Sequence, residues 1–191
     1  MYHIKNDPRS QKTAQVLGEA MFRCLQTTPL NSVKVADLYR ETGIARSTFY
    51  RLFDTPEDVL YYLCDQFVEH ASHRFEGYVF SDIKELSIAS INLSIEYHEL
   101  LEILIKNHRQ DLLSELFAAN FRNITARIPV LEGLDEITSE YAENLLYSAM
   151  TSLQTTWFLR GRKENPEQLF TYLQEYEQIL RRTLIMEKTD T

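Results

Sequence analysis

Apolar side chains recur at steps of three and four residues along most of the chain, the spacing of one face of an α-helix. In the segment 10–27 this spacing includes Leu17, Met21 and Leu25. The range 83–105 is long enough for two helices with a break near His98. No segment shows the alternation typical of a strand, so the pattern predicts an all-α fold of about nine helices. Besides 10–27 and 83–105, helices are expected over 34–41, 45–52, 56–79, 109–127, 135–161 and 166–187.

Helix-stopping residues separate these segments. Pro29 ends the first helix because proline cannot continue the hydrogen-bond ladder. Gly43 lies in the next break and suits a left-handed backbone. Asp54 or Thr55 can cap the helix that begins near Pro56, since both residue types accept hydrogen bonds from the first turn.

Composition narrows the class of protein. The length of 191 residues suits one or two domains, and 5 Gly with 5 Pro are too few for a β-sandwich or a Gly-rich nucleotide-binding fold. Cys24 and Cys64 lie in helix-like apolar patterns and are expected to be reduced core thiols. The chain has no run of ~18 apolar residues, the length that would predict a membrane span. The N-terminus lacks the apolar segment of a signal peptide, so we expect a cytoplasmic protein.

The charge is distributed unevenly. The net charge of −8 argues against a nucleic-acid-binding protein. Residues 1–53, however, hold eight Lys and Arg against four Asp and Glu, so this part is +4 and the remaining 138 residues are −12. Such an asymmetry indicates two regions with different partners. We therefore expect a DNA-binding domain over 1–55 and a larger helical domain over 56–191.

The two short helices around Gly43 have the pattern of a helix-turn-helix. Phe49 and Phe53 lie four residues apart, share one face of the second helix and can pack inward. The rest of its surface combines small residues, which permit close approach to a groove, with hydroxyl and guanidinium donors. An ordinary pair of surface helices with solvated charges is the alternative. The candidate DNA-binding residues are Lys34, Ala45, Arg46, Ser47, Thr48, Tyr50 and Arg51.

The chemistry of these residues suggests separate roles. The Arg46 guanidinium matches the O6 and N7 acceptors of guanine. The hydroxyl groups of Thr48 and Tyr50 can hold phosphates, which fix the position of a protein on DNA without reading its sequence. Lys34 lies where the preceding helix would meet the phosphate backbone.

The segment from Val33 to Leu60, centred on TGIARSTFYRLF at 42–53, resembles the DNA-binding domain of TetR-type transcriptional regulators. Its form at 46–50 is similar to the branch that includes dihydroxyacetone-kinase-type regulators. The resemblance implies a homodimer that binds a palindromic operator, with one helix-turn-helix per subunit. It also implies that the last two helices form the dimer interface and that the middle helices enclose a small-molecule pocket. Two residues depart from the family's sequence pattern. Pro56 occupies a position where a phosphate-binding Lys is common, and Tyr39 occupies a position where a small residue is common.

Residues of the second domain are candidates for the ligand and the partner subunit. His98, Phe117, Phe121, Tyr147 and Trp157 are candidate pocket residues, although each of these residue types is also common in an ordinary core. The dimer interface implied by the resemblance includes Leu153, Trp157, Leu173, Tyr176 and Leu180.

Other chemistry receives little support. Glu69-His70 and His73-Glu76 place two imidazoles and two carboxylates on one helix, but a solvated polar face explains them as well as a metal site does. No catalytic motif, metal site or cofactor site is expected, and we do not expect an enzyme. The sequence thus predicts a ligand-responsive, DNA-binding homodimeric repressor. The alternative is a co-regulator that acts mainly through protein–protein contacts.

Overall fold

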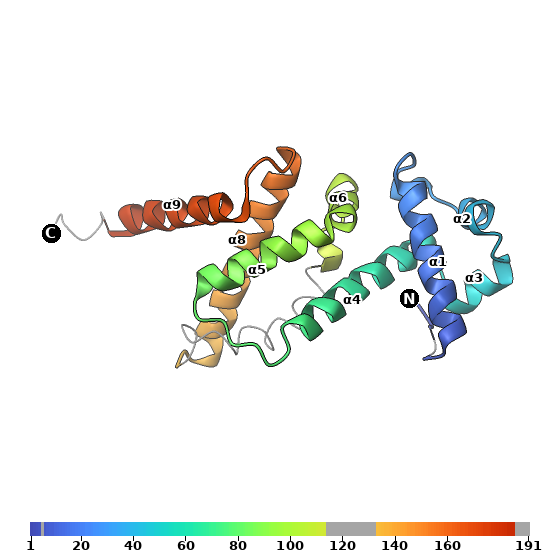
Figure 1. The fold of residues 1–191 in the computed structure, drawn as a ribbon, viewed down its shortest axis with the longest axis horizontal. Coiled ribbons are helices and arrows are strands. Elements are labelled where there is room, and N and C mark those ends of the chain that lie inside the picture. Colours follow the sequence, from blue (N-terminus) through green and yellow to red (C-terminus); the bar gives the residue numbers. More distant parts are fainter. Residues whose placement is uncertain (5, 114–132, 186–191) are drawn as a thin grey trace. The chain divides into compact units, whose positions relative to one another are not determined.

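The computed structural model describes residues 1–4, 6–113 and 133–185, and these residues form an all-α fold (Figure 1). The one β-type pairing among them is an isolated antiparallel bridge between Tyr2 and Phe53. The all-α prediction is confirmed. The helices are α1 (Pro8–Leu25), the 3-10 helix η1 (Leu30–Ser32), α2 (Val35–Thr42), α3 (Arg46–Leu52), α4 (Pro56–Arg74), α5 (Ile83–Glu96), α6 (His98–Lys106), α8 (Glu136–Leu159) and α9 (Pro166–Ile185).

Local signals set most helix ends. The Asp7 carboxylate accepts hydrogen bonds from the backbone of Arg9 and Ser10 and so caps α1. Thr55 caps α4, with Pro56 in its first turn as the sequence predicts. The expected break in 83–105 falls between α5 and α6. The helix expected over 109–127 lies mostly outside the described residues.

Contacts divide the chain into two compact units: unit 1 is Met1–Glu76 with Tyr97–Asn120, and unit 2 is Gly77–Glu96 with Phe121–Thr191. This division follows packing, and the functional boundary at 55/56 stays a prediction. In unit 1, α4 packs closely on α1 at Gly18, where an added Cβ would lie 2.8 Å from Leu63 Cδ2. The largest fully buried side chains of unit 1 are Leu17, Met21, Leu38, Phe49, Phe53, Leu52, Leu60, Leu104 and Val59.

Burial also defines the state of the cysteines. Both are free thiols; Cys64 is buried in α4 and Cys24 is half-buried in α1. Loss of hydration in the apolar surroundings raises the pKa of the Cys64 thiol to about 12, because burial disfavours the charged thiolate. Cys64 is therefore a packing residue rather than a nucleophile at neutral pH.

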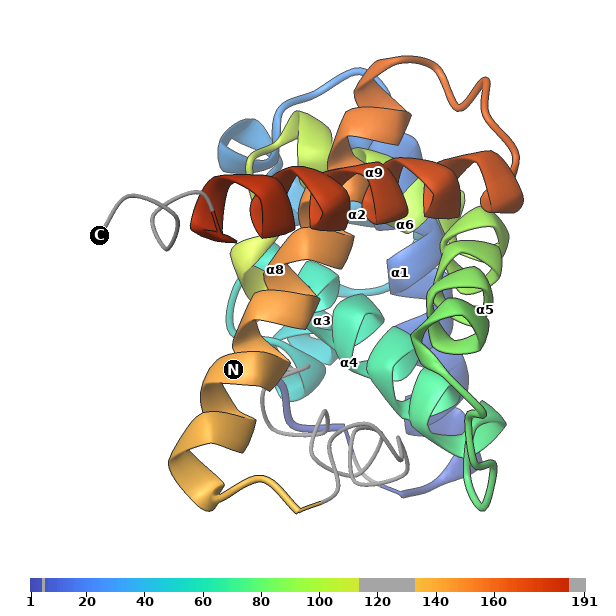
Figure 2. The ribbon, with the colours of Figure 1, turned by 90° about the vertical axis from the view of Figure 1, so that its left-hand side faces the viewer.

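In unit 2, α5 packs against α8 and α9, and α9 runs across α8 (Figure 2). The core cluster of these helices consists of Ile91, Met150, Trp157 and Leu169. The Trp157 indole N–H donates to the carbonyl oxygen of Glu164 at 3.0 Å, which satisfies its polar atom. Unit 2 therefore has an apolar core of its own.

The outer face of α8 differs from the simplest expectation of its apolar pattern. Tyr141 and Leu145 continue that pattern in sequence, yet each is 69% exposed. At 100° per residue they lie on the side of the helix opposite Met150 and Trp157, which face the core. Helix α8 is thus apolar on two faces, and among the described residues only the face with Met150 and Trp157 belongs to the core.

Candidate nucleic-acid interface

The turn between α2 and α3 is tightly built. Gly43 ends α2 in the left-handed region with φ of 69°, and its N–H donates to the carbonyl oxygen of Tyr39 at 2.7 Å. The Thr42 hydroxyl donates to the carbonyl of Leu38 at 2.8 Å and accepts from the backbone N–H of Ile44 at 3.1 Å. These bonds hold the end of α2 and the first residues of the turn.

Replacing Gly43 with alanine is expected to lower the free energy of unfolding by about 1 kcal/mol, because a left-handed backbone disfavours a Cβ. The space around Gly43 is open, so the cost comes from the backbone alone. Urea unfolding measures it. Gly77→Ala is the matched control, with φ of +73° and equally open space. Gly77→Ala should lower the free energy of unfolding by a similar amount without weakening DNA binding. An unchanged free energy of unfolding in Gly43→Ala would contradict the left-handed backbone at Gly43.

The inner face of α3 anchors it to unit 1. Phe49 and Leu52 are 1% exposed and Phe53 is fully buried. The rings of Phe49 and Phe53 lie 5.8 Å apart, as their spacing of four residues predicts. The apolar anchors therefore leave the remaining sides of α3 facing outward.

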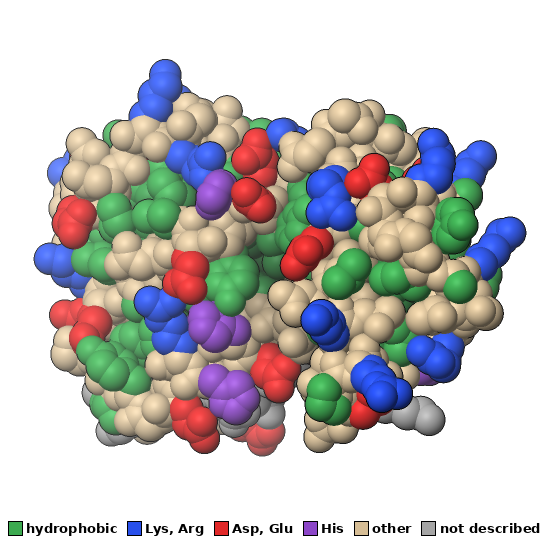
Figure 3. All heavy atoms as spheres, turned by 45° about the vertical axis from the view of Figure 1, so that its right-hand side comes forward, with side chains coloured by type: hydrophobic (Ala, Val, Ile, Leu, Met, Phe, Trp, Pro, Cys, Tyr) green, Lys and Arg blue, Asp and Glu red, His purple; other side chains and the backbone are tan. Residues whose placement is uncertain are grey.

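That outward surface carries the residues expected to bind DNA. Ala45, Arg46, Ser47, Tyr50 and Arg51 are exposed, and Thr48 is half-buried. The Arg46 guanidinium lies 5.9 Å from the centre of the Tyr50 ring, a cation–π contact that holds the two side chains together. Figure 3 turns the part of the surface that carries α1–α3 toward the reader, and blue Lys and Arg side chains project from it. The structure thus brings these candidates together on one short helix.

Two further residues belong to α2 and its N-cap: Tyr39 lies within the helix and Lys34 precedes it. Lys34 is exposed and precedes α2, and its backbone N–H donates to the Asp37 carboxylate at 2.9 Å. Asp37 also pairs with Arg40 on the next turn. Tyr39 is 53% exposed, so its ring adds surface beside the turn rather than filling the core.

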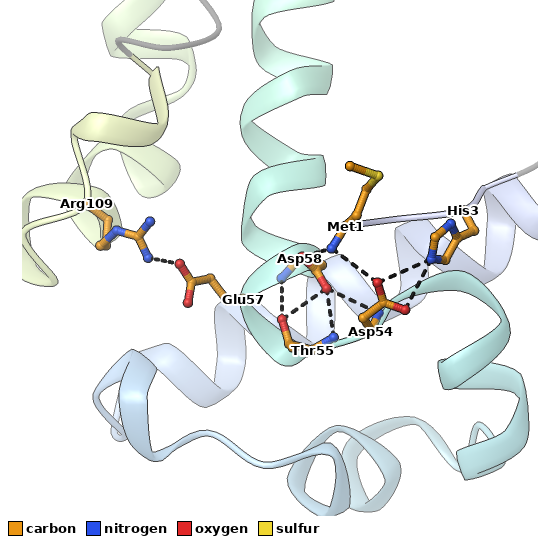
Figure 4. A network of polar contacts seen from close by, with 7 residues as sticks. All are labelled: Met1, His3, Asp54, Thr55, Glu57, Asp58 and Arg109. Carbon is orange, nitrogen blue, oxygen red and sulfur yellow. Dashed lines mark hydrogen bonds and ion pairs between the residues drawn. The ribbon is translucent and has the colours of Figure 1, made fainter.

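The first turn of α4 is acidic and is held from one side by the N-terminus. The His3 imidazole contacts Asp54 at 3.1 Å, and the Met1 ammonium contacts Asp58 at 2.6 Å (Figure 4). The hydrogen bond with His3 holds the pKa of the Asp54 carboxyl below its usual value. Burial opposes the same change at Asp58, but bonds from Met1 and Thr55 lower its pKa overall.

The other side of this turn contacts the segment after α6. Arg109 pairs with Glu57 (Figure 4). It also pairs with Asp111, at 3.0 Å between Nε and Oδ1. Asn107 accepts a hydrogen bond from the backbone N–H of Leu30 at 2.9 Å. The segment 107–111 is therefore tied to both the entrance and the exit of the helix-turn-helix. Sequence reasoning missed these ties and the N-terminal contacts, since no local pattern marks a pair of residues 51 to 77 positions apart.

The candidate pocket residues are spread over both units. His98 is half-buried in unit 1, whereas Tyr147 is half-buried and Trp157 buried in unit 2. Phe117 and Phe121 lie outside the described residues. A pocket formed by these side chains stays a prediction.

The candidate dimer residues fall into two groups. Trp157 is buried in the core of its own unit, and Leu153 and Leu173 pack partly buried against it. Tyr176 and Leu180 are 51% and 39% exposed. Exposed apolar residues on α8 and α9 that sequence reasoning left out of the interface are Ile137, Tyr141, Leu145, Leu159, Tyr172 and Ile179.

The paired His and Glu side chains around the end of α4 do not form a metal site with the other described residues. His73 lies 3.9 Å from Glu69 and 3.4 Å from Glu76. The side chains of Glu69, His70, His73 and Glu76 are exposed. Within 1–4, 6–113 and 133–185, no cluster of three or more potential ligands is placed to hold a metal ion. In the same ranges, no helix has the length and apolar character needed to span a bilayer.

Comparison with known proteins shows a likeness of fold. The chain is similar to a crystal structure of the transcriptional regulator FadR from Bacillus subtilis in complex with stearoyl-CoA. The TM-score is 0.62 at 19% sequence identity, and the match covers 84% of this chain and 95% of that chain. No family model matches the chain, and no curated protein matches it in sequence. At this identity the likeness shows the fold alone.

Proposed function

We propose that the protein is a TetR-type, DNA-binding transcriptional regulator. The observation that carries the proposal is the pair α2–α3, in which buried Phe49 and Phe53 leave Arg46, Tyr50 and Arg51 exposed on one short helix. Side chains of this kind suit base edges and phosphates when a helix enters the major groove. The match of residues 42–53 to the TetR pattern and the fold shared with a transcriptional regulator support the same class.

The protein acts as a homodimer on a palindromic operator. Two reading helices must lie about 34–36 Å apart to enter successive major grooves on one side of B-DNA. The exposed apolar faces of α8 and α9 supply the contact between subunits, because such faces are costly to leave in water. A closed two-fold dimer uses the same patch on both subunits and therefore pairs the two reading helices symmetrically.

A small molecule controls the spacing of the reading helices. The ligand binds the DNA-incompetent arrangement more tightly and depletes the competent one, which relieves repression. The stearoyl-CoA bound to the similar FadR structure makes a long-chain acyl-CoA the first compound to test. A cytoplasmic location follows from this role.

A gel-shift titration against the DNA upstream of the protein's own gene tests the proposal. We expect a sequence-selective shift that weakens as salt rises, because phosphate contacts release counterions. Adding stearoyl-CoA should reverse the shift if an acyl-CoA is the ligand. Absence of selective, salt-sensitive binding would overturn the DNA-binding function. If the protein does not bind DNA but binds a purified partner protein through α8 and α9, the result would instead support a co-regulator.

A further inference from the structure

We infer that the N-terminal strap, residues 1–4, is a positioning element of the DNA-reading apparatus. The strap lies against the junction between α3 and α4 and holds the end of the reading helix on α4. The inference rests on the proposed DNA-binding function and adds to it residues that precede the helix-turn-helix in the chain.

Backbone pairing ties the strap to the end of α3. Tyr2 and Phe53 form an antiparallel bridge. The His3 N–H donates to the carbonyl oxygen of Leu52 at 2.7 Å, and the Asp54 N–H donates to that of Met1 at 3.4 Å. Leu52 is the last residue of α3, so these bonds hold the point where the reading helix stops.

The Tyr2 ring connects this junction to α4. Its centre lies 6.4 Å from that of Phe53, 6.2 Å from Tyr61 and 5.4 Å from Tyr62, where the contact is edge-on. The Tyr2 hydroxyl donates to the Asp65 carboxylate. One half-buried side chain thus connects the end of α3 with the second and third turns of α4.

The strap also compensates charge beside the reading helix. Asp54 and Asp58 lie directly after α3, where carboxylates would repel phosphates. The Met1 ammonium contacts both carboxylates, and His3 contacts Asp54. The strap therefore both fixes the α3–α4 angle and reduces negative charge at that edge of the candidate interface.

Position matters because α3 has only seven residues. A helix this short owes its orientation to packing rather than to its own hydrogen bonds. Recognition residues must be held within about 0.5 Å of their productive placement. A strap that fixes the last residue of α3 therefore affects affinity even without a contact to DNA.

The test compares operator affinity and local order in Tyr2→Ala and Tyr2→Phe. We expect Tyr2→Ala to raise the Kd for operator about tenfold. Tyr2→Phe keeps the ring contacts and should stay within about threefold of the unmodified protein. Leu25→Ala, a truncation in the last turn of α1, is the control for a general loss of stability. All titrations are made where unfolding curves show each variant fully folded.

Hydrogen exchange of the His3 and Asp54 amides provides a readout independent of DNA. Both amides should exchange faster in Tyr2→Ala and remain protected in Tyr2→Phe and Leu25→Ala. If the unmodified protein binds no operator while its His3 and Asp54 amides are protected, the proposed DNA-binding function is overturned, whereas the contact of the strap with the α3–α4 junction stands. Normal affinity of Tyr2→Ala, or a loss no larger than that of Leu25→Ala, would overturn the positioning role. Equal losses in Tyr2→Phe and Tyr2→Ala, with the His3 and Asp54 amides still protected in both variants, would point to a direct contact of the hydroxyl with DNA and would overturn it too.

Discussion

Replacing Arg46 with alanine is expected to weaken operator binding by about 1–3 kcal/mol, roughly 5- to 150-fold, and to relax specificity at one base pair. Arg46 is the exposed first residue of α3, the end of a reading helix that contacts base edges. Its guanidinium can donate two hydrogen bonds to the O6 and N7 atoms of one guanine. Titrations against the operator and against single-base variants measure both effects.

Tyr50→Phe is the matched comparison for this prediction. Phenylalanine keeps the ring over which the Arg46 guanidinium lies and removes only the hydroxyl. Since Tyr50 is assigned to a phosphate, its loss should weaken all sequences alike. Arg46→Lys should retain the charge but lose the paired hydrogen bonds, and so lose discrimination. A uniform loss for Arg46→Ala would contradict base reading, and a base-specific loss for Tyr50→Phe would contradict the phosphate assignment.

Local signals explain why much of the fold is predictable from the sequence. The start of α4 depends on Thr55 and Pro56, which act within one turn of the helix. The α2–α3 turn depends on Gly43, whose left-handed backbone few other residues adopt. The inward anchors Phe49 and Phe53 follow from a spacing of four residues. Each of these features involves residues close in sequence, so one chain is enough to predict them.

Features that depend on distant residues escape such reasoning. Nothing near Tyr2 indicates that its ring meets Tyr61 and Tyr62, because that contact depends on how α4 packs. The pair Arg109–Glu57 joins residues 52 positions apart. The apolar pattern of α8 cannot decide which of its two apolar faces packs into the core of the described residues.

The charge of the reading domain has a consequence for binding. A region of +4, doubled in a dimer, attracts DNA only weakly in a nonspecific way. The carboxylates of Asp54, Glu57 and Asp58 would reduce that attraction further. The contacts of the Met1 ammonium with Asp54 and Asp58 and of Arg109 with Glu57 offset this effect. Affinity for the operator then depends mainly on placing the α3 side chains correctly, which increases the importance of whatever fixes α3.

The exposed apolar face of α8 supports a second prediction of large effect: Leu145→Asp should convert the proposed dimer to a monomer. Ile137, Tyr141 and Leu145 are spaced four residues apart and are 68%, 69% and 69% exposed, so they form one continuous apolar stripe. In a two-fold interface each substitution occurs twice, and each carboxylate loses hydration without a partner. The dimer dissociation constant should rise by at least about 100-fold, equivalent to about 3 kcal/mol.

Analytical ultracentrifugation at micromolar concentration measures this change, and operator titration measures its consequence. A monomer engages one half-site at a time, so operator affinity should fall sharply while circular dichroism remains that of a folded helical protein.

Val79→Asp is the control, because Val79 is 65% exposed and apolar but lies outside α8 and α9. A Leu145→Asp protein that stays dimeric would place the subunit contact elsewhere. Equal dissociation in Val79→Asp would show that the effect is not particular to α8. The unmodified protein could instead prove monomeric and still bind its operator. DNA binding would then not depend on the stripe of Ile137, Tyr141 and Leu145, and the stripe would be assigned to a different partner.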